Sequence, residues 1–122
     1  MAYSITIESD FSAAHRLRGY RGKCENLHGH NWKVGLTISS EVLDKIGMVC
    51  DFKEAKASLN KVIEALDHKD LNKVSPFNKK NPTSELIAEY IFNSYKKKLR
   101  GKLKLESVSV WETPTSCATV KG

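Results

Sequence analysis

Apolar residues alternate with polar residues in two segments near the N-terminus. Over residues 3–9 and 32–38, apolar side chains occupy every second position: Tyr3, Ile5, Ile7, Trp32, Val34, Leu36 and Ile38. A period of two is typical of half-buried strands. The basic stretch RLRGYRGKCENL contains two glycines and lies between these segments. We therefore expect two strands joined by a loop in a hairpin-like connection.

A helical pattern begins at Asp51, which can serve as an N-cap. The apolar residues after it recur three and four positions apart, as one face of an amphipathic helix requires. They are Phe52, Ala55, Leu59, Val62, Ile63 and Leu66. The segment NKVSPFNKKNP then interrupts the pattern.

A second helix is predicted from the segment TSEL, where Thr83 or Ser84 can cap the first turn and Glu85 suits its positive end. Its apolar stripe consists of Leu86, Ile87, Tyr90, Ile91 and Tyr95. A basic cluster ends the helix, with Gly101 as a stop. The cluster contains Lys96, Lys97, Lys98 and Arg100.

Strand character returns near the C-terminus. Residues 103–112 place Val108, Val110 and Glu112 on one face, and residues 116–121 can supply a short last strand. The order strand-strand-helix-helix-strand-strand predicts an α+β fold, with an antiparallel four-stranded sheet and two helices on one face. The length of 122 residues predicts a single domain over residues 1–122.

Charge and cysteine content narrow the functional class. The net charge of +6 suggests a polyanionic partner, either nucleic acid or a small molecule with several phosphates. Three cysteines are an odd number, which favours free thiols in a reducing compartment. The N-terminus resembles neither a signal nor a transit peptide, and the apolar runs are too short to span a membrane. We therefore expect a cytoplasmic protein that acts without membrane insertion.

Three of the four histidines could form a metal site. His28 and His30 are two positions apart on a strand, so their rings point to one face. His15 ends the first strand and reaches the same place if the two strands pair. Three imidazoles with one open position are typical of catalytic zinc. A closed structural site with Cys24 as the fourth ligand is the alternative, and spacing does not separate the two.

The fourth histidine, His68, directly follows Asp67 near the end of the first predicted helix. These two residues could form a simple polar turn. They could also work with Cys24, the imidazole polarising the thiol and the carboxylate orienting the imidazole. Glu112 is expected to be semi-buried, so it needs a partner, either a salt bridge or a ligand with adjacent N–H donors.

Six segments in order resemble the 6-pyruvoyl-tetrahydropterin synthase family, and most closely its bacterial 6-carboxytetrahydropterin synthase branch in queuosine biosynthesis. They are FSAAHRL, CENLHGHNW, GMVCDF, LDHKDLN, NPTSE and VSVWETP. The resemblance implies a tunnelling fold, in which subunit sheets join edge to edge into a trimeric barrel. Two trimers then stack as a homohexamer. It further implies an enzyme, a carbon-carbon or carbon-oxygen lyase.

The resemblance also implies roles for individual residues. His15, His28 and His30 would bind one Zn²⁺ per subunit, and Cys24, Asp67 and His68 would transfer protons across a subunit boundary. Glu112 would anchor the pterin, with Thr83 and Ser84 lining its pocket. Under this assignment Cys24 is a base, so the zinc keeps its open position.

The implied reaction converts 7,8-dihydroneopterin triphosphate to 6-carboxy-5,6,7,8-tetrahydropterin and releases acetaldehyde and triphosphate. The side-chain hydroxyls of the substrate would occupy the open zinc position. A group of basic residues flanks the metal motif and could bind the triphosphate or simply form a solvated loop. The group consists of Arg16, Arg18, Arg21 and Lys23.

The motif leaves the product open. Cys24 precedes the HGH pair with the spacing of the carboxy-forming branch, whereas the animal pyruvoyl enzymes typically space the cysteine farther away. Glu25 also fits the pattern of a bacterial branch that makes 6-hydroxymethyl-dihydropterin for folate synthesis. The alternatives are therefore a pyruvoyl product, or a hydroxymethyl product that depends on Glu25.

A different class of function is a zinc-stabilised nucleic-acid-binding module that uses the basic cluster and Lys102. That cluster lies at a helix C-terminus, where cations are favourable in any case, and no base-reading motif accompanies it. We therefore expect a small-molecule substrate and no nucleic-acid partner.

Overall fold

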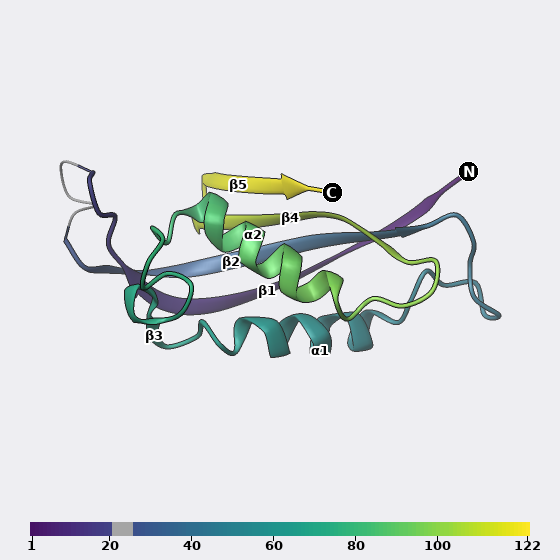
Figure 1. Ribbon diagram of the computed structural model, residues 1–122. Coiled ribbons are helices and arrows are strands. Elements are labelled where there is room, and N and C mark those ends of the chain that lie inside the picture. Colours follow the sequence, from purple (N-terminus) through teal and green to yellow (C-terminus); the bar gives the residue numbers. More distant parts are fainter. Residues whose placement is uncertain (21–25) are drawn as a thin grey trace.

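The computed structural model describes residues 1–20 and 26–122 (Figure 1). The long hairpin strands are β1 (Tyr3–His15) and β2 (His28–Ser40), and the last two strands are β4 (Lys104–Thr113) and β5 (Ser116–Lys121). The helices are α1 (Phe52–Ile63) and α2 (Ser84–Lys96). Between them lie the short strand β3 (Lys69–Asp70) and the 3₁₀ turn η2 (Leu71–Lys73).

The sheet has five strands in the order β3-β1-β2-β4-β5. The prediction of a purely antiparallel four-stranded sheet is therefore wrong. The four predicted strands pair antiparallel, but β3 adds a parallel edge to β1 at Ala13 and Ala14. The sheet is mixed and open, with β3 and β5 at its two edges.

Strand β3 arises from the turn that follows α1. His68 has a φ of 57°, in the left-handed region that only a few non-glycine residues adopt. Its backbone N–H donates to the Ser12 carbonyl oxygen over 2.6 Å, which brings the chain alongside β1. Two residues are too short to show a period in the sequence, which is why the pattern did not predict this strand.

Both helices lie on the same face of the sheet, as predicted (Figure 1). The Asp51 side chain accepts hydrogen bonds from the Lys53 and Glu54 N–H groups, and the Thr83 hydroxyl accepts one from the Leu86 N–H. Both predicted caps are confirmed. The helices enclose a core with the inward side chains of the strands, of which Trp32 is fully buried.

The other face of the sheet is polar and neither helix covers it (Figure 1). Hydroxyl groups pair across it between Thr6 and Thr37 and between Ser109 and Thr119. The Trp111 indole lies on this face. A Cβ on Gly35 would come within 3.2 Å of that ring, so the glycine gives the indole room to lie against the strand. This face therefore has the character of a surface in contact with water.

Within the described residues, we find no helix long and apolar enough to cross a membrane.

Tyr95 provides a test of the helix packing. Its buried hydroxyl donates to the Ala55 carbonyl oxygen over 3.0 Å and so ties α2 to α1. Burial, with a smaller contribution from Cys50, raises the pKa of Tyr95 to about 12. We expect Tyr95→Phe to lower the free energy of unfolding by about 1 kcal/mol at neutral pH, because one buried hydrogen bond is lost.

The difference between Tyr95→Phe and wild type should shrink between pH 10 and about 12, where tyrosinate forms first in the unfolded chain. Urea unfolding across this range measures both effects. Tyr20→Phe is the control, since Tyr20 is exposed. An unchanged gap at high pH would contradict the assignment.

Candidate metal centre

Three histidine side chains converge at one end of the helix-covered face. The pairing of β1 with β2 sets His15 opposite His28 and Ala13 opposite His30, so the three rings share a face. The ring centroids of His15 and His28 are 4.6 Å apart, those of His28 and His30 4.7 Å, and those of His15 and His30 5.3 Å. The hairpin therefore assembles the cluster that the HGH motif predicted.

Backbone carbonyls decide which nitrogen each ring presents. His15 Nδ1 lies 2.7 Å from the Pro82 carbonyl oxygen, and His28 Nδ1 lies 2.7 Å from the Asn26 carbonyl oxygen. A carbonyl can only accept, so each Nδ1 carries the proton and donates it. Both rings are left with Nε2 as the free electron-pair donor, which is the form that binds a metal.

Glu112 completes the cluster. Its Oε1 lies 3.0 Å from His15 Nε2 and 3.3 Å from His30 Nε2, and the four ligand atoms lie within 4.8 Å of one another. Within the described residues, neither Nε2 atom makes a hydrogen bond, although both are buried. A neutral imidazole and a carboxylate thus face each other as acceptors. A cation between them would satisfy both, so the donor set fits a metal such as zinc.

The environment keeps His30 ready to bind a cation. Burial lowers the pKa of His30, and His15 and His28 lower it further, against the opposing effect of Glu112. The ring therefore stays neutral to a lower pH than an exposed histidine. Trp32 forms the wall behind the cluster, with its ring centroid 4.8 Å from that of His15 and its Nε1–H donating to the Ala13 carbonyl. This apolar wall limits the access of water from the core side.

Asp67 and His68 lie together at the edge of β1. Asp67 Oδ1 is 3.0 Å from His68 Nδ1 and accepts the Ser12 N–H over 2.9 Å. The Ser12 N–H bond, followed by His68, lowers the pKa of Asp67, so the carboxylate is ionised at neutral pH. The His68 side chain is 82% exposed. The carboxylate therefore orients an imidazole that projects into solvent.

The structure does not bring all the predicted residues together. Ser12 is three strand residues before His15, or roughly 10 Å along β1, and His68 is not part of the metal cluster. Cys24 and Glu25 lie outside the described residues, as do Arg21 and Lys23. The Thr83 hydroxyl caps α2, so the predicted cap is present and this hydroxyl is already engaged in a hydrogen bond within the helix.

Comparison with known proteins identifies the family. The sequence model of the protein family described as 6-pyruvoyl tetrahydropterin synthase matches residues 4–122 of this chain. The chain belongs to this family. The chain is 35% identical in sequence to 6-carboxy-5,6,7,8-tetrahydropterin synthase of Haemophilus influenzae, and the match covers 93% of this chain and 95% of that protein. The tetrahydropterin synthases are lyases, so the chain is an enzyme of this class.

Two further relatives extend the comparison. Dihydroneopterin monophosphate aldolase of Pyrococcus furiosus is 36% identical, over 92% of this chain and 91% of that protein. The solved structure of 6-pyruvoyl tetrahydropterin synthase from Caenorhabditis elegans superposes with a TM-score of 0.88 at 32% identity, covering 100% of this chain and 96% of that one. The fold and the family are therefore common to relatives with different named activities.

Arg18 is one of the four basic residues for which the sequence allowed either a contact with the triphosphate or a place in a solvated loop. Its guanidinium donates to the Phe77 carbonyl oxygen over 3.0 Å and to the Lys80 carbonyl oxygen over 3.2 Å. These contacts fix the segment that precedes α2, so Arg18 has a structural task. Of the four basic candidates for the triphosphate, only Arg16 is both described and exposed.

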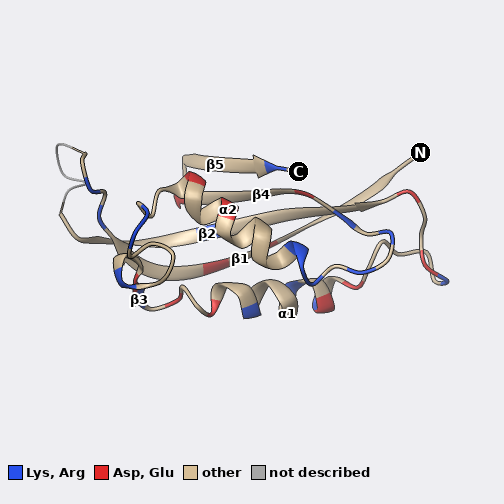
Figure 2. Cartoon of the chain, in the orientation of Figure 1, with Lys and Arg blue, Asp and Glu red and all other residues tan. Residues whose placement is uncertain are grey.

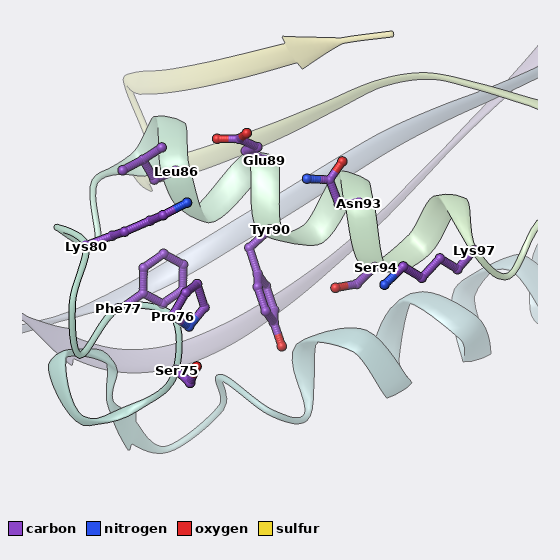
Figure 3. Close-up of a pocket in the computed structure, with 10 residues that line it drawn as sticks. All are labelled: Ser75, Pro76, Phe77, Lys80, Leu86, Glu89, Tyr90, Asn93, Ser94 and Lys97. Atoms are coloured by element: carbon purple, nitrogen blue, oxygen red, sulfur yellow. The ribbon is translucent and has the colours of Figure 1, made fainter.

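A separate cavity of about 330 Å³ lies between that segment and α2 (Figure 3). The rings of Phe77 and Tyr90, with centroids 5.7 Å apart, form its apolar part, and Lys80 and Lys97 lie at its rim. None of the predicted site residues lines it. The cavity is therefore separate from the histidine cluster.

The cluster predicts a simple dependence of metal binding on sequence. The wild-type chain should bind about one zinc ion, and His15→Ala should lose most of this binding because one of three imidazole ligands is removed. His68→Ala is the matched control, since this exposed histidine lies outside the cluster. Equilibrium dialysis measures the bound zinc. Equal loss of zinc in both variants would contradict the assignment of ligands.

Proposed function

We propose that the chain is a zinc-dependent 6-carboxy-5,6,7,8-tetrahydropterin synthase of queuosine (7-deazaguanine) biosynthesis. It would convert 7,8-dihydroneopterin triphosphate and one water to the carboxy product, acetaldehyde and triphosphate. The observation that carries the proposal is the set of three imidazoles around one point. In two of them, His15 and His28, Nε2 is the nitrogen whose electron pair is free to bind a metal. The proposal is supported by relatives with this named activity, whose similarity covers 93% and 91% of this chain.

His15, His28 and His30 would hold the zinc ion. When bound, zinc supplies a Lewis acid that stabilises negative charge developing on substrate oxygen. The carbonyl bonds to Nδ1 of His15 and His28 keep these rings in the tautomer that coordinates through Nε2. The buried position of His15 excludes water from its side of the site.

Glu112 would bind the substrate at the mouth of this cluster. Its side chain is 31% exposed, so one carboxylate oxygen faces the histidines while the group remains within reach of a ligand. A carboxylate can accept two adjacent N–H groups of a pterin in a bidentate way. Thr83 and Ser84, at the start of α2, would line the pterin pocket beside Glu112. The Thr83 hydroxyl already accepts the Leu86 N–H and so caps the helix.

Cys24, Asp67 and His68 would transfer protons. Cys24 would act on the side-chain carbons, and His68, oriented by Asp67, would serve a hydroxyl oxygen; each positioned acid or base contributes about 10²–10⁴ in rate. The exposure of His68 and its distance along β1 from the histidine cluster support a role at the site of a neighbouring subunit. The active site would then be complete only in the assembled enzyme.

The sheet supports this assembly. Its edge strands β3 and β5 offer unpaired backbone groups, and proteins usually cover such edges. Joining the edges of three subunits would form a barrel with the helices outside and the polar sheet face inside. Two such trimers would make the homohexamer. Basic segments lie around β3 and the connection after β1 (Figure 2), near the site proposed for the triphosphate, where Arg16, Arg21 and Lys23 are the candidates.

The direct test is to incubate the purified protein with dihydroneopterin triphosphate and identify the pterin products by mass. We expect the carboxy product from the wild type and none from Cys24→Ala, which removes the proposed base while about one zinc per chain is retained. Cys117→Ala, a change of an exposed cysteine, should behave like the wild type.

Loss of zinc from Cys24→Ala would instead make the thiolate a metal ligand and the site a closed one. If the wild-type protein formed a different pterin, the proposed activity would be wrong.

A hydroxymethyl pterin is the second candidate product, and the similarity to a dihydroneopterin monophosphate aldolase favours it. Glu25 adjoins Cys24 and fits the pattern of the enzymes that make this product. A carboxylate beside the thiol would offer a second proton acceptor. The two products would then depend on different residues of the same loop.

Glu25→Ala separates these products. We expect this variant to form the carboxy pterin at the wild-type rate and to lose any hydroxymethyl pterin, because only the latter reaction would use the carboxylate. Mass analysis of both products from the same incubation gives the ratio. Unchanged amounts of both would refute a catalytic Glu25.

A further inference from the structure

The three residues before and at the start of α2 connect the helix to the metal cluster. The Pro82 carbonyl oxygen accepts the buried hydrogen bond from His15 Nδ1 over 2.7 Å. On one side of it, the Thr83 hydroxyl caps α2 by accepting the Leu86 N–H. On the other side, the Asn81 side chain binds the backbone of Arg18. The carbonyl that orients a metal-binding ring is therefore held from both sides.

Asn81 holds Arg18 in the way that a neighbouring strand would. Its Oδ1 accepts the Arg18 N–H over 2.9 Å, and its Nδ2 donates to the Arg18 carbonyl oxygen over 2.8 Å. The same amide thus uses its acceptor and one donor on a single residue. Because Arg18 follows His15 by three residues, the segment that leaves β1 and the segment that enters α2 are joined twice, once through the His15 ring and once through Asn81.

Proline at position 82 restricts the backbone that carries this carbonyl. Pro82 has no N–H, and its ring fixes φ, so the direction of its carbonyl depends on the residues at either end. Pro82 is buried, and its carbonyl oxygen lies where the His15 ring needs an acceptor. Partners that hydrogen-bond a metal ligand directly typically change metal affinity or activity 10- to 100-fold when they are mutated.

We propose that Asn81 is a positioning residue for the metal centre, and that it acts through the Pro82 carbonyl on the orientation of the His15 ring. The inference rests on the proposed metal-binding role of the cluster. The hydrogen bonds of the Asn81 side chain go to Arg18 and not to the ligand atoms of the cluster. Its effect reaches the metal because a displaced carbonyl would free the His15 ring to rotate or to change tautomer.

The chain contains a matched control. Asn72 makes the same pair of hydrogen bonds with Arg16, its Oδ1 accepting the Arg16 N–H over 2.8 Å and its Nδ2 donating to the Arg16 carbonyl oxygen over 3.1 Å. Asn72 lies in η2, ten residues before Pro82, so its side chain holds the segment that follows His15 and not the carbonyl that the His15 ring meets. Removing either amide removes the same two bonds, but only one of them supports the acceptor of His15.

The experiment is a titration of the full-length apoprotein with Co²⁺, followed by its visible absorption, for wild type, Asn81→Ala and Asn72→Ala. We expect Asn81→Ala to raise the dissociation constant about 10- to 100-fold and to alter the absorption bands. Asn72→Ala should bind Co²⁺ as the wild type does. Circular dichroism of each apoprotein checks that the fold is retained.

If Asn81→Ala does not fold, Asn81→Asp is used. The aspartate keeps the acceptor for the Arg18 N–H and loses the donor to the Arg18 carbonyl. Asn81→Asp should also weaken Co²⁺ binding, whereas Asn72→Asp should not. Equal effects of the two positions, or no effect at Asn81, would overturn the inference. Absence of Co²⁺ binding by the wild type would overturn the proposed metal site itself, so the two failures are distinguishable.

Discussion

The register between β1 and β2 is the constraint on which the site depends. With His15 opposite His28, every inward side chain of the hairpin falls on the helix-covered face, and the three imidazoles fall at its end. A slip by one residue would turn one strand's histidines toward the polar face. The fully buried Trp32 and Val34 oppose such a slip, because it would expose them. The packing of the core thus maintains the geometry of the cluster.

The cluster in turn combines groups that would be unfavourable neighbours on their own. The Nε2 atoms of His15 and His30 face one carboxylate oxygen of Glu112, and the bond from His15 Nδ1 to a carbonyl leaves the neutral His15 ring with an electron pair on Nε2 toward that oxygen. Elsewhere in the core, buried polar groups have partners, as the Tyr95 hydroxyl and the Trp32 N–H do. The concentration of unsatisfied acceptors at one point is what separates a metal centre from a set of packed histidines.

Much of this arrangement could be predicted from the sequence. The period of two placed His28 and His30 on one face, and the caps at Asp51 and Thr83 were confirmed, because these signals are local. The proximity of Glu112 to the histidines was not predicted, since it depends on the pairing of β4 with β2 far along the chain. A semi-buried carboxylate at period two with Val108 and Val110 was the available signal.

The interactions made by backbone groups were also beyond the sequence pattern. The Pro82 and Asn26 carbonyls and the side-chain amides of Asn72 and Asn81 leave no periodic signal in the sequence, and neither do the bonds from Arg18 to backbone carbonyls. Such contacts depend on how loops meet in space. The sequence therefore indicated which histidines could form a metal site, and the structure shows which backbone and side-chain contacts hold them.

The left-handed backbone of His68 has a consequence for substitution at this position. Glycine, asparagine and aspartate tolerate such a conformation, whereas valine, isoleucine or threonine would be strained there. The role proposed for His68 in proton transfer requires an imidazole as well, so few replacements at this position can preserve both the path of the chain and the proposed chemistry.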